Sequence, residues 1–102
     1  MAESDDLIHQ PLRLKIMAAL SAALDREPVD FPRLKAITQA TDGNLGSHLT
    51  ALEKAGYVTM TKDFAGKRPR TSVALTPEGR TAFRRHVAYL RELVESFGGG
   101  DV

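Results

Sequence analysis

The residues best suited to chemistry lie between positions 43 and 54, where small polar side chains recur at helical spacing. At about 100° per residue, Leu45, Leu49 and Leu52 share one narrow face, which must meet a core. The opposite side carries only small, polar or cationic residues, namely Gly43, Asn44, Ser47, Thr50, Ala51 and Lys54. Such a face suits a helix that enters a major groove, because short side chains let the backbone approach the base edges. An ordinary solvated helix has the same composition, so this stretch alone leaves both interpretations open.

Each polar side chain on this face has a chemistry that suits DNA. Asn44 is able to pair with adenine through two hydrogen bonds, and Ser47 and Thr50 are able to reach a base or a phosphate. Lys54 lies further out, toward the phosphate backbone, and His48 lies at the flank between core and solvent. A short helix and a tight polar turn precede this helix, which favours a helix-turn-helix.

A second group of candidate binding residues lies in the stretch Gly66-Lys67-Arg68-Pro69-Arg70. It connects two short strand patterns, so its three cations are expected at the tip of a hairpin. Guanidinium groups suit phosphates and the negative potential of a narrow minor groove. A solubilising edge loop also explains the positive charge, but not its concentration at one tip.

The net charge of +1 conceals a segregation of charge along the chain. Residues 43–91 hold nine basic and three acidic side chains, whereas residues 1–30 hold three basic and six acidic ones. Residues 92–102 hold three acidic side chains and no basic one. A basic middle between acidic ends is typical of a nucleic-acid surface, although alternating charges on a solvated helix explain the composition equally well.

Periodicity and breaker residues predict a mainly α fold with a small β-hairpin, in the order α-α-α-β-β-α. An apolar stripe from Leu12 through Leu24 predicts the first helix, which begins at Pro11. Val29 forms a short strand at most. The remaining elements are a helix from the cap Asp30 to about Thr38, a helix over 42–55, strands over 57–61 and 71–75, and a helix from Pro77 to about Phe97.

The last helix carries more apolar surface than one small domain needs. Phe83, Val87, Leu90, Val94 and Phe97 recur at alternating steps of four and three, the seam of a packed helix pair. Tyr89 and Leu93 add a second stripe, and Leu14 lies off the stripe of the first helix. We therefore expect a homodimer through these eight residues, with a wide amphipathic helix of a monomer as the alternative.

Several classes of function are excluded by composition. The chain has no cysteine, which rules out disulfide scaffolds, thiolate metal sites and thiol switches. No catalytic constellation, cofactor motif or metal site is expected, because His9, His48 and His86 are scattered and neither Glu92 nor Glu95 shares a helix face with His86. We expect His86 at a helix surface or dimer rim. No apolar run is long enough to span a membrane and no signal pattern is evident, so we expect a cytoplasmic protein.

Four stretches carry a resemblance to a known family: "HQPLRLKIMAAL", "TDGNLGSHLTALEKAGYV", "GKRPRTSVALTPEGR" and the long terminal helix. From His9 to Phe97 the chain resembles winged-helix transcriptional regulators of the MarR/ArsR type, most closely the small stand-alone winged-helix domains related to MarR. The resemblance implies a dimer on operator DNA, with Asn44, Ser47, His48 and Thr50 on the reading helix and Lys67, Arg68 and Arg70 on the wing. Many relatives have Ser where this chain has Gly46, so the base-reading pattern of a relative is not transferable.

These observations predict a winged helix-turn-helix that binds double-stranded operator DNA as a homodimeric transcriptional regulator. We expect residues 1–10 to be a polar arm, 11–76 the DNA-binding domain, 77–97 its dimerisation helix and 98–102 a flexible tail. An effector, whether a small molecule or a protein, is of unknown identity. The alternative is a winged-helix module that binds protein while its basic hairpin stays solvated.

Overall fold

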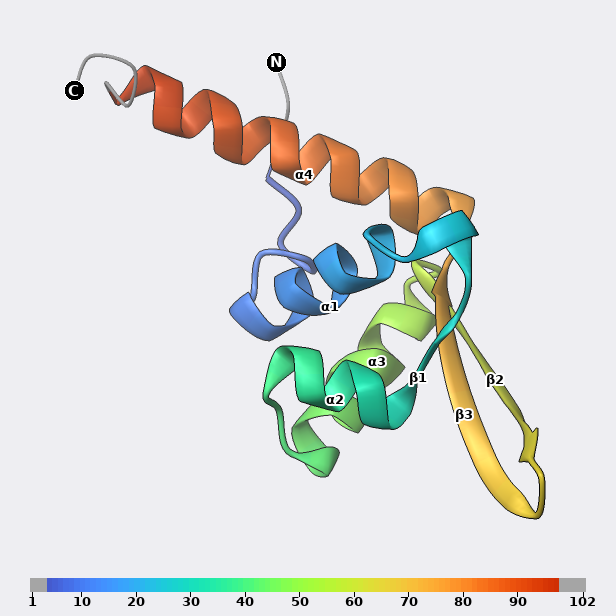
Figure 1. Cartoon of the computed structure of the whole chain (residues 1–102). Helices are drawn as coiled ribbons and strands as arrows, with labels where there is room; N and C mark the ends of the chain where they lie inside the picture. The colour runs from blue at the N-terminus through green and yellow to red at the C-terminus, as the bar shows by residue number, and fades with distance from the viewer. Residues whose placement is uncertain (1–3, 98–102) are drawn as a thin grey trace.

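Four helices and a three-stranded antiparallel sheet make up residues 4–97, the part of the chain that this computed structural model describes (Figure 1). The helices are α1 (Pro11–Ser21), α2 (Phe31–Thr38), α3 (Asp42–Lys54) and α4 (Pro77–Ser96). The strands are β1 (Val29–Asp30), β2 (Val58–Ala65) and β3 (Arg68–Leu75). This order confirms the predicted fold class. The tail expected at 98–102 lies outside the described residues.

The helix starts follow the capping signals in the sequence. Proline stands in the first turn of α1, α2 and α4, where its missing N–H costs no hydrogen bond. A side-chain oxygen caps α2, α3 and α4 by accepting a hydrogen bond from the backbone three residues on. These caps are Asp30 to Arg33, Thr41 to Asn44 and Thr76 to Gly79, at 2.9, 3.2 and 2.9 Å.

The first helix is shorter than its apolar period predicts. It ends at Ser21, and a 3-10 turn follows over Leu24–Arg26. Leu24, expected on the buried stripe, is 84% exposed. The chain must leave the helix here because Val29 pairs with Val73 in β3 and adds the short third strand to the sheet.

The hairpin of β2 and β3 is longer than the sequence predicts. Its pairing runs from Val58 opposite Leu75 to Ala65 opposite Arg68, which leaves only Gly66 and Lys67 as the turn. Gly66 has a φ of +67°, as the first position of a type II′ turn requires. Residues 61–70 are all exposed, so no buried face imposes the alternation that reveals a strand in sequence.

One apolar core joins the helices to the base of the sheet. Its buried members include all three leucines of the predicted α3 face, and each of those leucines has no exposed surface. Ile8 is also fully buried, although residues 1–10 were expected to be a polar arm. The core consists of Ile8, Ile16, Met17, Leu20, Val29, Leu34, Leu45, Leu49, Leu52, Val58 and Val73.

Asp5 holds the segment before α1 against the rest of the fold. One oxygen of its carboxylate accepts hydrogen bonds from the backbone of Leu7 at 3.0 Å and Ile8 at 3.2 Å, which closes a turn. The other oxygen accepts from the Tyr57 hydroxyl at 2.7 Å, and this bond raises the pKa of Tyr57. The backbone N–H of Asp5 donates to Nδ1 of His86 at 3.1 Å. Asp5 therefore links the N-terminal turn to the start of β2 and to α4.

His86 is fully buried, which corrects the expectation that it lies at a helix surface or dimer rim. Because its Nδ1 accepts from a backbone N–H, the imidazole carries its hydrogen on Nε2, which has no partner among residues 4–97. The ring stacks on Tyr89 and meets the ring of His9 edge-on. Burial, reinforced by His9, lowers the pKa of His86, whereas the charge of Asp5 opposes that shift.

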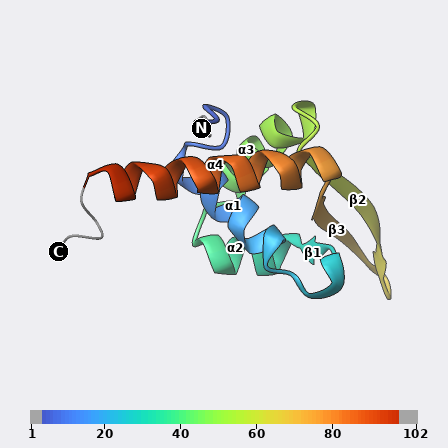
Figure 2. The same cartoon turned by 90° about the horizontal axis from the view of Figure 1, so that it is seen from above.

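The first turn of α4 lies directly on the backbone at the end of α3. The Thr76 hydroxyl donates to the Gly56 carbonyl at 2.5 Å, and the Thr76 N–H donates to the Tyr57 carbonyl at 3.1 Å. A Cβ at Gly79 would lie far inside van der Waals distance of that Tyr57 carbonyl. Glycine is therefore required at position 79 by this close approach of two backbones. Figure 2 shows α4 crossing over α1, with α2 and α3 to either side.

The lowered pKa of His86 predicts that acid destabilises the fold. Between its ordinary pKa of about 6.5 and the lower folded value, the unfolded state binds a proton that the folded state does not. The free energy of unfolding should therefore fall as the pH drops below about 6.5. Urea denaturation at a series of pH values and one protein concentration measures it.

The matched variant is His86→Asn, which keeps an acceptor near Nδ1 but does not titrate. Its free energy of unfolding should vary less between about pH 8 and about pH 5 than that of the wild type. His9→Asn alters an exposed neighbour and should retain most of the dependence. Equal pH dependence in the wild type and His86→Asn would show that other groups cause it.

Candidate nucleic-acid interface

The exposed face of α3 is the one that the sequence predicts. Asn44, Ser47, Thr50 and Lys54 are exposed, on the side opposite the buried leucines. The Thr50 hydroxyl donates to the Gly46 carbonyl at 2.9 Å, so in this rotamer its oxygen is left to accept. The face thus offers an amide, two hydroxyls and an ammonium group, with no large apolar side chain among them.

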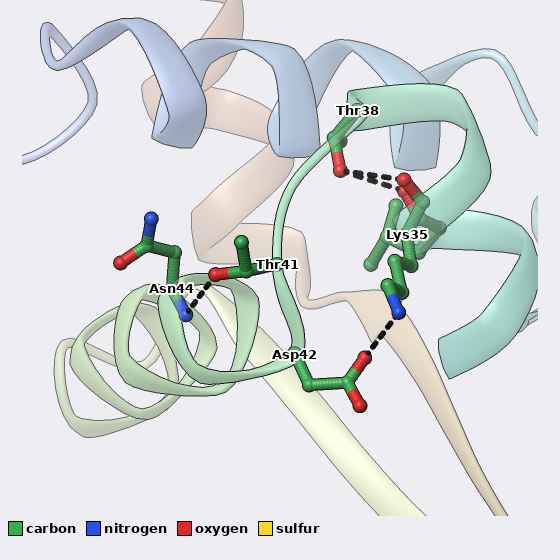
Figure 3. Close-up of polar contacts among 6 residues, drawn as sticks. Lys35, Thr38, Thr41, Asp42 and Asn44 are labelled. Atoms are coloured by element: carbon green, nitrogen blue, oxygen red, sulfur yellow. Dashed lines mark hydrogen bonds and ion pairs between the residues drawn. The ribbon is translucent and has the colours of Figure 1, made fainter.

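The turn between α2 and α3 is held by several short-range contacts (Figure 3). Gln39 ends α2 in the left-handed conformation at φ +58°, and buried Thr38 donates its hydroxyl hydrogen to the Leu34 carbonyl at 2.8 Å. Lys35 and Asp42 form an exposed ion pair of 2.7 Å across the turn. The Asn44 N–H is used by the Thr41 cap, while its side-chain amide is directed away from the turn. The turn therefore fixes how α3 presents Asn44.

His48 is half-buried at the flank of α3, as the helical wheel predicts. The structure adds a neighbour that the sequence does not reveal. Nε of Arg13 in α1 donates to Nδ1 of His48 at 2.9 Å, and Nη1 of Arg13 donates to the Leu7 carbonyl at 3.3 Å. Arg13 and His48 are far apart in the chain, and no local pattern couples them.

The three wing cations differ in their surroundings. Arg70 forms a two-point ion pair with Asp63 on the opposite strand, at 3.0 and 2.9 Å. This pairing lowers the pKa of Asp63 and raises that of Arg70. Arg68 and Arg70 both lie within β3, rather than in a loop as expected. Among residues 4–97, no carboxylate lies within ion-pair distance of Lys67 or Arg68, so these two carry the uncompensated charge of the wing tip.

The predicted dimerisation residues fall into two groups. Leu14 and Phe83 pack against the core of their own chain, and Val87, Tyr89 and Leu90 are half-buried. The second group is exposed, and it lies on the half of α4 that extends beyond α1 (Figure 1). It consists of Leu93, Val94 and Phe97, which are 40%, 61% and 84% exposed.

Residues 4–97 contain neither a metal-binding cluster nor a helix that could span a membrane. Among residues 4–97, no three His, Cys, Asp or Glu side chains gather where they could hold a metal ion. None of the helices in that range is both long and apolar enough to cross a membrane.

Comparison with known proteins identifies the family. Residues 12–94 match the model of a family described as the winged helix DNA-binding domain. The chain belongs to the winged helix DNA-binding domain family. In this family's terms, α2 and α3 form the helix-turn-helix, with α3 as its second helix, and β2 and β3 form the wing.

Individual relatives agree with this assignment. The chain is 33% identical over 87 residues to an uncharacterised protein of Methanocaldococcus jannaschii, covering 85% of this chain and 91% of that one. A transcriptional regulator homologue from Pyrococcus horikoshii has a TM-score of 0.78 and 32% identity, with 94% of this chain and 89% of that chain covered.

A MarR family regulator from Silicibacter pomeroyi shares the fold, with a TM-score of 0.70 and 23% identity. The match covers 94% of this chain but only 62% of that regulator. The winged helix is therefore of the type found in MarR and ArsR transcriptional regulators, and the chain is a DNA-binding regulator rather than an enzyme.

Two glycines in helices allow a matched test of the close approach between α4 and the backbone of Tyr57. A Cβ at Gly46 of α3 would meet no atom within 4 Å, so Gly46→Ala should stabilise the fold by about 0.5–1 kcal/mol through helix propensity. Gly79→Ala should destabilise it by about 1–3 kcal/mol or more, because α4 must shift from Tyr57. Urea denaturation measures both. Equal effects of the two variants would contradict the close approach at Gly79.

Proposed function

We propose that the chain binds specific double-stranded DNA sequences as a homodimer and regulates transcription at these sites. The observation that carries the proposal is the division of α3 into two faces. Three fully buried leucines hold one face in the core, so the other must present small polar side chains to the outside. A helix of this kind beside a cationic hairpin has the parts that major-groove reading and backbone contact require.

Two sets of side chains make different kinds of contact with DNA. Asn44, Ser47 and Thr50 read base edges, with His48 at the side of the same helix. Lys54, Lys67, Arg68 and Arg70 contact the phosphate backbone or the minor groove, and supply most of the affinity. The ion pair with Asp63 holds the Arg70 guanidinium in one orientation and offsets its charge.

The exposed apolar end of α4 supports the homodimer. Leu93, Val94 and Phe97 have no cover within residues 4–97, and burying them against the same helix of a second chain would remove that surface from water. Leu14, Phe83, Val87, Tyr89 and Leu90 complete the proposed interface and its support. Twofold symmetry would place two reading helices about 34–36 Å apart, which matches half-sites one DNA turn apart.

The function is tested by fluorescence anisotropy with a pool of random duplexes, titrated at several salt concentrations. Binding that weakens steeply with salt supports a DNA-binding surface, and the pool then yields the preferred sequence. Weak binding with a flat salt dependence would favour the alternative, a winged-helix module that binds protein. An effector, small molecule or protein, would be sought by its influence on this affinity.

Removal of one wing cation should weaken binding to every duplex alike. Arg68 has no ion-pair partner among residues 4–97, so its charge is available to a phosphate. We expect Arg68→Ala to flatten the plot of log affinity against log salt by about 1 unit. Arg91→Ala, which removes the same charge from the distal half of α4, is the control and should leave the slope nearly unchanged. An unchanged slope in Arg68→Ala would remove Arg68 from the interface.

Removal of the Asn44 side-chain amide should weaken binding only where the contacted base pair is the preferred one. We expect Asn44→Ala to cost about 1–3 kcal/mol of binding free energy on the preferred duplex, and little on duplexes changed at the contacted base. Competition anisotropy with a set of single-base variants of the selected sequence measures this difference. If Asn44→Ala weakened binding to every duplex equally, Asn44 would be a phosphate contact instead.

A further inference from the structure

The contact between Arg13 and His48 determines where the His48 ring carries its hydrogen. A guanidinium Nε–H is always a donor, and it lies 2.9 Å from Nδ1 of His48. Nδ1 must therefore accept, which leaves the hydrogen of the neutral imidazole on Nε2. Among residues 4–97, no group accepts a hydrogen bond from that Nε2. The half-buried ring thus has an unused donor on the reading helix.

Arg13 is itself held at its other end. Its Nη1 donates to the Leu7 carbonyl, in the turn that the Asp5 carboxylate closes. The side chain is half-buried and spans from the N-terminal turn to α3. Two anchors on one planar group leave the guanidinium little freedom, so it fixes the direction of the imidazole as well as its tautomer.

We propose that Arg13 is a positioning residue that presents the Nε2–H of His48 as a hydrogen-bond donor to an acceptor on DNA. This inference rests on the proposed DNA binding by α3. His48 follows Asn44 by one helical turn, so both are on the same flank of the helix. A donor at Nε2 suits a phosphate oxygen, or the base acceptors O6 and N7 of guanine, N7 of adenine and O4 of thymine. It does not suit the amino groups of adenine and cytosine.

The tautomer is measured first, on the free wild-type protein, from the 15N chemical shifts of the His48 ring. We expect the hydrogen on Nε2. A hydrogen on Nδ1 would overturn the inference without any variant. In Arg13→Met, which removes the donor and keeps a chain of similar length, both tautomers should appear.

The second test is a double-mutant cycle on affinity for the selected duplex. Arg13→Met and His48→Leu should each weaken binding by about tenfold, and the double variant should bind no more weakly than His48→Leu alone. Additive losses would overturn the positioning role, because Arg13 would then contact DNA by itself. His48→Gln keeps a donor near the place of Nε2 and should recover part of the affinity.

Lys15→Met provides the charge control, since it removes one positive charge from an exposed position on α1. It should weaken binding less than Arg13→Met. An equal loss in the two variants would show that Arg13 acts only through its charge, and it would overturn the inference. Far-UV circular dichroism of each variant ensures that only folded proteins are compared.

Comparing duplexes of different sequence shows whether the acceptor for His48 lies on a phosphate or on a base. A loss in His48→Leu that is the same on every sequence indicates a phosphate oxygen, and a loss confined to one base pair indicates an acceptor on a base edge. If the wild type binds no duplex, the proposed function fails, and this inference fails with it. If the wild type binds but the cycle is additive, only the role of Arg13 fails.

Discussion

The orientation of α3 is set by the burial of its leucine face, and the other elements are arranged around that helix. Leu45, Leu49 and Leu52 have no exposed surface, and each fully buried leucine contributes about 1.5–3 kcal/mol. Once these three occupy the core, the helix cannot rotate without exposing them. The small polar residues on its other side are therefore held outward as a fixed set, whatever they contact. The outward face of α3 is thus a consequence of core packing.

A polar framework sets the position of the elements around that helix. Asp5 connects the N-terminal turn to Tyr57 through its carboxylate and to His86 through its backbone N–H, so three distant parts of the chain meet at one residue. At the end of α3, Thr76 and Gly79 hold α4 on the backbone that leads into the wing. Helix α3, the wing and α4 are thus connected through a short stretch of chain.

The wing is stabilised differently, because most of its length packs against no core. Residues 61–70 are exposed, and the hairpin there is maintained by its strand pairing, its glycine turn and the ion pair between Asp63 and Arg70. That ion pair leaves Lys67 and Arg68 as the uncompensated charges of the tip. The polar composition that hid these strands from sequence periodicity is the same property that leaves them free to meet a phosphate backbone.

Elements whose signals are local can be predicted from the sequence alone. The caps at Asp30, Thr41 and Thr76, and the leucine stripe of α3, each depend on residues within a few positions of one another. Long-range contacts are visible only in the folded molecule, where they bury Ile8 and His86 and pair Arg13 with His48. A histidine or an arginine has the same local pattern on a surface as in a core, because its partner comes from a distant part of the chain.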